Sequence, residues 1–173
     1  MRLYLRRFNE LDSALCLRVN RVSHYRWVRL CFRLVSRHGD GVFWYAVMLG
    51  IWLTQGLAGL LPCLHMILVG LFGTLLYKWL KGKTSRPRPY EIHRDIWLTG
   101  TPLGRLSFPS GHTLHAVAFC SVALVYYPML AWILLPFTFM VAMSRVILGL
   151  HYPSDVLAGA LIGLLIASVS FAI

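Results

Sequence analysis

The stretch from residue 42 to residue 77, VFWYAVMLGIWLTQGLAGLLPCLHMILVGLFGTLLY, contains no Asp, Glu, Lys or Arg. Because an apolar run of roughly 20 residues is enough for one bilayer crossing, this stretch is long enough for two. Two glycines and a proline near its middle favour a turn there: Gly56, Gly59 and Pro62. The stretch therefore predicts a hairpin of two transmembrane helices, Val42 to Leu61 and Pro62 to Leu80.

The last third of the chain is equally apolar. From Thr113 to Ile173 the only full charges are Arg145 and Asp155. The whole chain is 58% hydrophobic and 13% charged, with a mean hydropathy of +0.65, which is typical of membrane proteins rather than soluble domains. We expect an all-α, polytopic membrane bundle of about five helices. The three further spans are Thr113 to Tyr127, Met129 to Leu148 and Val156 to Ile173.

Residues 1–41 differ from the apolar domain, residues 42–173. Phe8, Leu11, Leu15, Val19 and Val22 recur at helical spacing, with arginines beside them. Many arginines make a crossing here unfavourable. We predict an amphipathic helix that lies on the membrane and anchors the fold, rather than one that binds substrate.

The charge balance and the cysteines narrow the class of partner. The formal net charge is +11, but the basic residues flank apolar spans, so anionic and other membrane lipids are the expected partners and nucleic acid is not. The four cysteines lack CxxC spacing. We interpret them as small core residues rather than metal ligands or disulfides: Cys16, Cys31, Cys63 and Cys120.

A basic loop, Lys81 to Pro89 (KGKTSRPRP), is expected after the second span. Such charges commonly flank membrane helices. However, two prolines stiffen this loop, and a guanidinium on a stiff backbone suits the paired oxygens of a phosphate. Lys81 and Arg88 are therefore candidate phosphate ligands.

A second motif, Phe108 to His112 (FPSGH), precedes the third span. Pro and Ser before an apolar run predict a helix N-terminus, where free N–H groups favour an anion. Ser110 and Gly111 are candidate phosphate-binding residues, and His112 is placed to give a proton to a leaving oxygen. His115 has no such context, and we interpret it as a packing histidine.

A third motif, Ser144 to Asp155 (SRVILGLHYPSD), joins the last two spans. Charges at the edge of apolar helices are costly, so Arg145 and Asp155 are functional candidates, with a structural Arg–Asp pair as the alternative. Pro153 favours the first turn of a helix, which brings Asp155 near His151. A carboxylate that holds one imidazole nitrogen leaves the other free as a nucleophile.

Alternation of five spans places the three motifs on one face of the membrane. Two histidines, one carboxylate and several cations form a constellation suited to phosphoryl transfer. Asp155 is the only carboxylate after Asp95, which leaves few oxygen ligands for Mg²⁺. We therefore predict a site without a metal and without a cofactor.

At these residues the sequence resembles the type-2 phosphatidic acid phosphatase superfamily, whose signature is K-x6-R-P, P-S-G-H and S-R-x5-H-x3-D. All three parts match in order and spacing. The resemblance implies that His151 forms a phosphohistidine, that Asp155 orients it and that His112 is the general acid. It also implies a phosphate-binding set made of Lys81, Arg88, Ser110, Gly111 and Arg145. The family's common form has six spans rather than five, and soluble vanadate-dependent haloperoxidases share the site architecture.

The favoured function is a lipid phosphatase with a phosphorylated lipid as substrate: undecaprenyl diphosphate, phosphatidylglycerophosphate or phosphatidate. A lipid phosphotransferase uses the same histidines with another acceptor. The alternative class is a lipid-binding or translocating protein without chemistry. His93, Arg94 and Arg105 contact either a second phosphate or only the membrane surface.

The expected location is a bacterial-type plasma (inner) membrane. In the five-span topology all 17 Lys and Arg residues belong to the face with the motifs or to its edge. The positive-inside rule then predicts a cytoplasmic active site, whereas many bacterial members of the resembled family work on the opposite face.

Overall fold

The computed structural model describes residues 2–102 and 104–173, with side chains from Arg7 onward, and these residues form helices joined by turns and by one longer connection that follows Ile92. A single isolated bridge pairs Pro87 with Leu106. The α-helices are α1 (Arg2–Asn20), α2 (Arg26–His38), α3 (Val42–Gln55), α4 (Leu60–Thr84), α5 (Pro89–Ile92), α6 (Gly111–Tyr126), α7 (Ala131–Ile147) and α8 (Pro153–Ser170). Three 3-10 turns separate some of them: η1 (Arg21–His24), η2 (Gly56–Gly59) and η3 (Pro128–Leu130).

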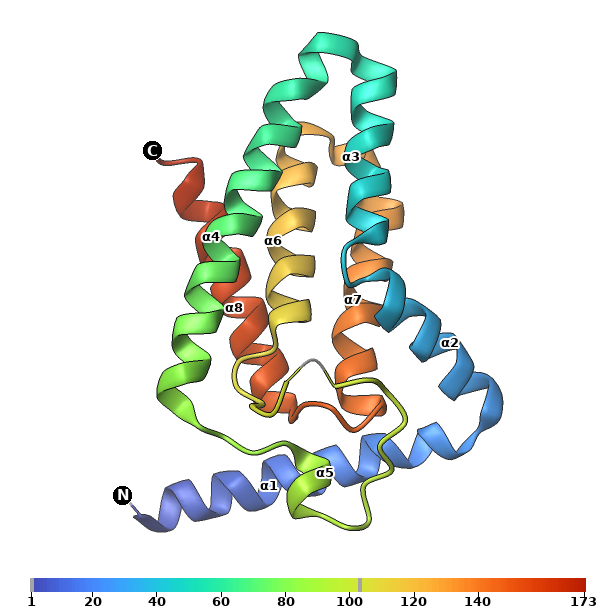
Figure 1. Cartoon of the computed structure of the whole chain (residues 1–173), viewed down its shortest axis with the longest axis vertical. Helices are drawn as coiled ribbons and strands as arrows, with labels where there is room; N and C mark the ends of the chain where they lie inside the picture. The colour runs from blue at the N-terminus through green and yellow to red at the C-terminus, as the bar shows by residue number, and fades with distance from the viewer. Residues whose placement is uncertain (1, 103) are drawn as a thin grey trace.

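Helices α3, α4, α6, α7 and α8 run side by side as one bundle (Figure 1). Three segments are long and apolar enough to cross a membrane, namely Val42–Thr84, Pro128–Ile147 and Pro153–Ser170, and Gly111–Tyr126 is a shorter apolar helix. The first segment has 43 residues and folds back on itself as the α3–α4 hairpin. The expected all-α membrane bundle is therefore confirmed.

The hairpin turns where its glycines lie. Gly56 ends α3 with a φ of 57°, a left-handed conformation that glycine adopts without steric cost. A Cβ added to Gly59 would lie 2.9 Å from the carbonyl oxygen of Ile51. Both positions thus require the small residue that the sequence supplies.

One predicted boundary is wrong in a way that affects the site. The second span was expected to end at Leu80 with Lys81 in a loop, but α4 continues to Thr84. Ser85, with a φ of 46°, terminates this helix. Since lysine is a good helix former and only Pro87 forbids continuation, the helix extends past the apolar run. Lys81 therefore projects from the last turns of α4.

The outside of the bundle is apolar. Large hydrophobic side chains are exposed along α3, α4, α7 and α8, among them Leu53, Leu61, Leu75, Trp132 and Leu161. Contiguous exposure of this kind marks a surface made for lipid. The interior is closed by buried residues from these helices and from α6, including Trp44, Met66, Leu114, Leu134 and Val141.

Two glycines of α8 let it approach α6 closely. A Cβ on Gly159 would lie 2.5 Å from the oxygen of Ser110, and one on Gly163 would lie 2.4 Å from the oxygen of Leu114. Small residues four apart permit this backbone contact between membrane helices. The contact fixes the start of α6 against the start of α8, and both starts carry predicted site residues.

The N-terminal segment lies at one end of the bundle. Helix α1 crosses beneath it, and α2 rises obliquely to α3 (Figure 1). The predicted apolar stripe is exposed at Phe8, Leu11 and Leu15, as an interfacial helix requires. A second face of α1, four residues apart at Asp12, Cys16 and Asn20, is buried against the protein.

Asn20 ties α1 to the bundle. Its side-chain nitrogen donates to the carbonyl oxygens of Trp97 and Ile147 at 3.0 and 2.9 Å, and its oxygen accepts from the backbone N–H of Trp97 at 2.8 Å. These bonds satisfy a side chain that is 1% exposed. An anchoring function for this segment is consistent with them.

The cysteine interpretation needs one correction. Cys16 and Cys120 are buried and Cys63 is half-buried, as core residues are, but Cys31 is exposed on α2. Helix α2 presents only one face to the bundle, so an apolar residue on its other face stays outside.

Candidate active site

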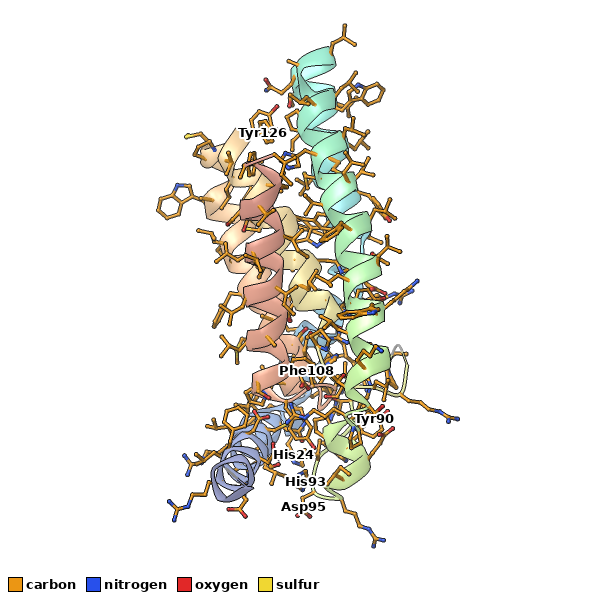
Figure 2. All side chains as sticks on the ribbon, turned by 90° about the vertical axis from the view of Figure 1, so that its left-hand side faces the viewer. His24, Tyr90, His93, Asp95, Phe108 and Tyr126 are labelled. Carbon is orange, nitrogen blue, oxygen red and sulfur yellow. The ribbon has the colours of Figure 1, made fainter. Side chains whose placement is uncertain are left out.

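The three sequence motifs meet at the end of the bundle that carries α1. In Figure 2, the labelled residues Tyr90, His93 and Asp95 lie at this end, Phe108 lies just above them, and Tyr126 lies toward the opposite end. Side chains that end in nitrogen gather toward the former end (Figure 2). The C-termini of α4 and α7 and the N-termini of α6 and α8 lie at this end (Figure 1), so one end of the bundle holds all predicted site residues.

His151 is positioned by the turn that ends α7. Gly149, with a φ of 76°, reverses the chain, and the backbone N–H groups of Leu150 and His151 both donate to the carbonyl oxygen of Arg145 at 3.0 Å. Since only glycine adopts this conformation without strain, the spacing between Arg145 and His151 follows from the turn. The His151 side chain is 2% exposed.

Asp155 stands beside His151, one helical turn later. Its Oδ2 lies 3.7 Å from His151 Nδ1, which is longer than a hydrogen bond, and this nitrogen has no hydrogen-bond partner among the described residues. Oδ2 instead accepts from Ser107 Oγ and from the backbone N–H of Tyr152 at 2.9 Å. The carboxylate is therefore fixed at the N-terminus of α8, with the imidazole next to it.

Arg86 is the cation that neutralises Asp155, and the motif analysis missed it. Its NH1 donates to Asp155 Oδ1 at 2.6 Å, and its NH2 donates to Asp12 Oδ2 at 2.7 Å. Asp12 also accepts from the backbone N–H of Ser154 at 3.0 Å. The alternative of a structural pair between Arg145 and Asp155 is thus wrong, because Asp155 pairs with Arg86. Helix α1 reaches the site through this network.

His112 has a carboxylate partner of its own. It lies in the first turn of α6, and its Nε2 is 3.1 Å from Asp40 Oδ1. Asp40 belongs to the connection between α2 and α3. The hydrogen bond from His112 keeps the pKa of this carboxyl below its usual range. The site therefore contains two Asp–His pairs from separate parts of the chain.

Arg88 and Arg145 are each 1% exposed. Arg88 donates through Nε to Gly104 O at 2.8 Å and through NH1 to Leu150 O at 3.1 Å. Arg145 donates through NH1 to Ser36 Oγ, while its Nε has no partner among the described residues. Backbone and hydroxyl acceptors hold both guanidinium groups without cancelling their charge, which leaves them able to bind an anion.

The start of α6 completes the site. Ser110 caps the helix and is fully buried, and its N–H donates to Asp155 O at 3.1 Å. Gly111 follows with its Cα facing Tyr77. Lys81 Nζ lies 5.4 Å from the centroid of the same Tyr77 ring. The first N–H groups of α6 and the lysine are thus brought to one place, as an anion site needs.

Burial sets the protonation state of His151. It lowers the pKa of the imidazole to about 3, and the charges of Arg145 and Arg88 act in the same direction, against the opposing effect of Asp155. The ring is therefore neutral near pH 7, with a lone pair available. A neutral imidazole is the form that acts as a nucleophile.

Two cavities adjoin the His112–Asp40 pair. One has a volume of about 690 Å³ and lies between α2, residues 98–101 and α7. The other has a volume of about 440 Å³ and lies between α3, α4 and α6, where Met48, Ile67 and Leu71 line it together with Lys81. We call them the polar cavity and the apolar cavity. Asp40 and His112 line both.

Two further histidines near the site, His115 and His93, have hydrogen-bond partners. His115 bonds Gly111 O at 2.8 Å and Thr74 Oγ1 at 3.0 Å, in agreement with a packing histidine. His93 Nε2 is 3.1 Å from Ser13 Oγ. Arg94 and Arg105 are exposed and line neither cavity. Among the described residues, no cluster of three or more His, Cys, Asp or Glu side chains is suited to hold a metal ion.

Known proteins are similar to this chain in sequence and in fold. The chain is 28% identical over 130 residues to the bacitracin transport permease protein BcrC of Bacillus licheniformis, and 28% identical over 125 residues to the undecaprenyl-diphosphatase BcrC of Bacillus subtilis. The alignments cover 73% and 72% of this chain. Each covers 64% of the relative, so the chain matches less than two thirds of the length of either protein.

The fold is similar to the crystal structure of Aquifex aeolicus LpxE. The TM-score is 0.81 at 25% sequence identity, over 94% of this chain and 96% of that one. The family model of the PAP2 superfamily matches residues 58–173, a range that contains all three motifs. The chain is therefore a membrane protein of the type-2 phosphatidic acid phosphatase (PAP2) superfamily.

Proposed function

We propose that this protein hydrolyses a phosphate or diphosphate ester on a membrane lipid through a phosphohistidine at His151. The observation that carries the proposal is the convergence of two Asp–His pairs and two buried arginines at one end of an apolar bundle. Such a set supplies a nucleophile, an acid and charge neutralisation at once. The named phosphatase activity of the Bacillus subtilis relative supports the same chemistry.

In the first half-reaction, His151 attacks the phosphorus atom. Its Nδ1 faces Asp155, so Nε2 is the attacking atom. An N–P bond forms as the P–O bond to the lipid breaks, and His112 gives its proton to the leaving oxygen. Asp155 stabilises the positive charge that develops on the His151 ring.

In the second half-reaction, water replaces the histidine. His112, now neutral, takes a proton from water as it attacks phosphorus, the N–P bond breaks, and inorganic phosphate leaves. Both histidines return to their starting protonation states. No redox step or further reactant is required.

The phosphate oxygens would be held by the five predicted ligands. Arg88 and Arg145 are fixed through backbone and hydroxyl contacts, so they are oriented before the substrate arrives, which lowers the cost of stabilising the transition state. Gly111 offers its N–H group at the start of α6, Ser110 offers its hydroxyl, since its own N–H is bonded to Asp155 O, and Lys81 adds a third cation.

A non-catalytic, translocating protein is the second candidate, because the Bacillus licheniformis relative is named a transport permease. Phosphate release by purified protein from undecaprenyl diphosphate, phosphatidylglycerophosphate and phosphatidate tests the first candidate, with His151→Ala as the blank. A wild-type protein that releases no phosphate but moves labelled lipid between leaflets would establish the second. Transfer of phosphate to an added lipid alcohol would identify a phosphotransferase.

We also propose a bacterial inner membrane with the site on the cytoplasmic face. The support is the basic N-terminal segment, whose arginines lie at the site end without belonging to a motif. In this arrangement the C-terminus is outside. A reporter fused after Ile173 tests it: alkaline phosphatase activity agrees with the proposal, and cytoplasmic fluorescence from a green fluorescent protein reverses it.

A further inference from the structure

The polar cavity is lined by two arginines that are not among the predicted phosphate ligands. Arg33 and Arg37 line it together with Arg145 and His112. Asp40 is the single carboxylate among its lining residues, and Asp40 is already bonded to His112. A cavity of about 690 Å³ with this balance favours an anionic ligand.

The two additional arginines share one face of α2. They are four residues apart, which places them one above the other on a helix. Arg33 Nε donates to Thr99 O, which orients its guanidinium, and no described residue binds its two terminal nitrogens. The side chain of Arg37 has no described partner. Both therefore keep the donors that form a bidentate contact with phosphate.

Two buried polar atoms on residues that line the cavity have no described partner. They are Arg145 Nε and Thr99 Oγ1, on side chains that are 1% and 7% exposed. No described residue bonds either atom. Leaving such atoms unbonded is unfavourable, and both residues line the polar cavity. This observation is independent of the arginine pair and also indicates a polar ligand.

The position of the cavity determines which part of a substrate reaches it. The bond that breaks joins the phosphorus attacked by His151 to the oxygen protonated by His112. Whatever group that oxygen carries must therefore begin at His112, and the polar cavity is lined by His112. In a lipid diphosphate this group is the second phosphate, and in phosphatidylglycerophosphate a glycerol separates the two phosphates.

We propose that the polar cavity is a subsite for a second phosphate on the leaving group, bound by Arg33, Arg37 and Thr99. This inference rests on the proposed function and adds a substrate class to it. Lipids with two phosphates are preferred over phosphatidate, which carries one. Helix α2 then selects the substrate, beyond the anchoring function that its sequence suggests.

The test is the selectivity of an Arg33→Gln/Arg37→Gln double variant. kcat/KM is measured in one detergent for undecaprenyl diphosphate, phosphatidylglycerophosphate and phosphatidate. We expect the ratio of either two-phosphate lipid to phosphatidate to fall by about tenfold or more, since each charge-assisted bond to phosphate is strong. If only the ratio for undecaprenyl diphosphate falls, the subsite binds a second phosphate that is attached directly to the oxygen protonated by His112. If only the ratio for phosphatidylglycerophosphate falls, the subsite binds a phosphate that a glycerol separates from that oxygen.

The matched control is Arg21→Gln/Arg26→Gln. It removes the same charge from the same segment, at two exposed residues that do not line the cavity, and its selectivity should equal that of the wild type. An unchanged ratio in the Arg33/Arg37 variant, or equal losses on all three lipids, would overturn the subsite.

A binding measurement separates this inference from the proposed function. Calorimetry with inorganic pyrophosphate should show tighter binding than with inorganic phosphate, and the double variant should lose that difference. Equal affinities for the two anions in the wild type would reject the subsite even if the lipids are hydrolysed. Conversely, a preference for pyrophosphate in a protein that hydrolyses no lipid would retain the subsite and reject the proposed function.

Discussion

His112 Nε2 lies 3.1 Å from Asp40 Oδ1, so a carboxylate from the α2–α3 connection contacts the histidine proposed as the general acid. A carboxylate at this distance favours the protonated imidazole. Asp40 thereby fixes the orientation of the imidazole and opposes the effect of burial on its protonation, which makes it a positioning residue rather than a catalytic one.

Asp40→Asn should lower kcat by about tenfold to a hundredfold, which is less than the roughly 10²–10⁴ that a general acid itself contributes, because His112 is still present. Because an amide favours the protonated ring less, the alkaline limb of the kcat profile should move to lower pH. Asp40→Glu should restore part of both effects. A loss of kcat with an unchanged pH profile would assign Asp40 a purely structural function.

His151→Ala should abolish turnover of every substrate, whereas His112→Ala should depend on the leaving group. Lipids whose leaving group is an alcohol, namely phosphatidate and phosphatidylglycerophosphate, should lose about 10²–10⁴ in kcat, and p-nitrophenyl phosphate, whose leaving group needs no proton, much less. Steady-state kinetics with both substrates checks this. With the pKa of His151 lowered to about 3, its protonation should not limit the rate near neutral pH, and a pKa near 6 for the His151 ring, measured by NMR in the protein, would contradict that value.

Arg86→Gln should destabilise the protein and slow it, because Asp155 is fully buried and would keep its charge without a cationic partner. Breaking a buried pair costs about 3–5 kcal/mol, and here Ser107 and the Tyr152 N–H offset part of that cost. Asp12→Asn should cost less, since Arg86 still pairs with Asp155. Thermal unfolding in detergent measures the stability of both variants. If Arg86→Gln and Asp12→Asn are equally stable, the Arg86–Asp155 contact contributes little.

Activity should survive exhaustive chelation, and vanadate should inhibit competitively. Vanadate adopts the five-coordinate geometry of the phosphorus that His151 attacks, and cationic side chains supply the charge neutralisation. The assay is phosphate release after dialysis against EDTA. Loss of activity that Mg²⁺ alone restores would contradict this mechanism.

Gly159→Ala should reduce both stability and kcat, because its Cβ would meet the Ser110 carbonyl oxygen at 2.5 Å and displace the start of α6. Gly163→Ala, one turn farther along α8, should affect stability more than kcat. Gly50→Ala on α3 is the control, since nothing lies within 4 Å of its Cβ and alanine suits a helix better by up to about 1 kcal/mol. If the three variants have the same stability and the same kcat, the close contact between α6 and α8 contributes little to either quantity.

The sequence predicted the helical bundle and the meeting of the three motifs at one of its ends, for a physical reason. Transmembrane spans are predicted from local hydropathy, and the motifs are short runs at helix ends, so both can be recognised from neighbouring residues. The contacts of Asp12, Asp40 and Arg86 join residues that are far apart in the sequence, so neighbouring residues do not reveal them. Asp12 meets Arg86 across 74 positions, and in the sequence each is an ordinary charge on a polar segment.

The same limit applies to α2. Amphipathicity predicted its interfacial position, but not that Arg33 and Arg37 face a cavity beside His112. That arrangement depends on the packing of α2 on α7, where Arg145 donates to Ser36. The periodicity of residues 1–41 predicts an amphipathic helix, but it does not predict which other helix this segment packs against.

The shared border of the two cavities at His112 and Asp40 has a consequence for the direction of the reaction. The proposed hydrolysis there would yield one product that dissolves in water and one that dissolves in lipid. The free phosphate is diluted into the aqueous phase, while the shortened lipid diffuses away in the plane of the bilayer. Recombination would require both to return to one point from two different phases. Partition of this kind opposes the reverse reaction without any additional device in the protein.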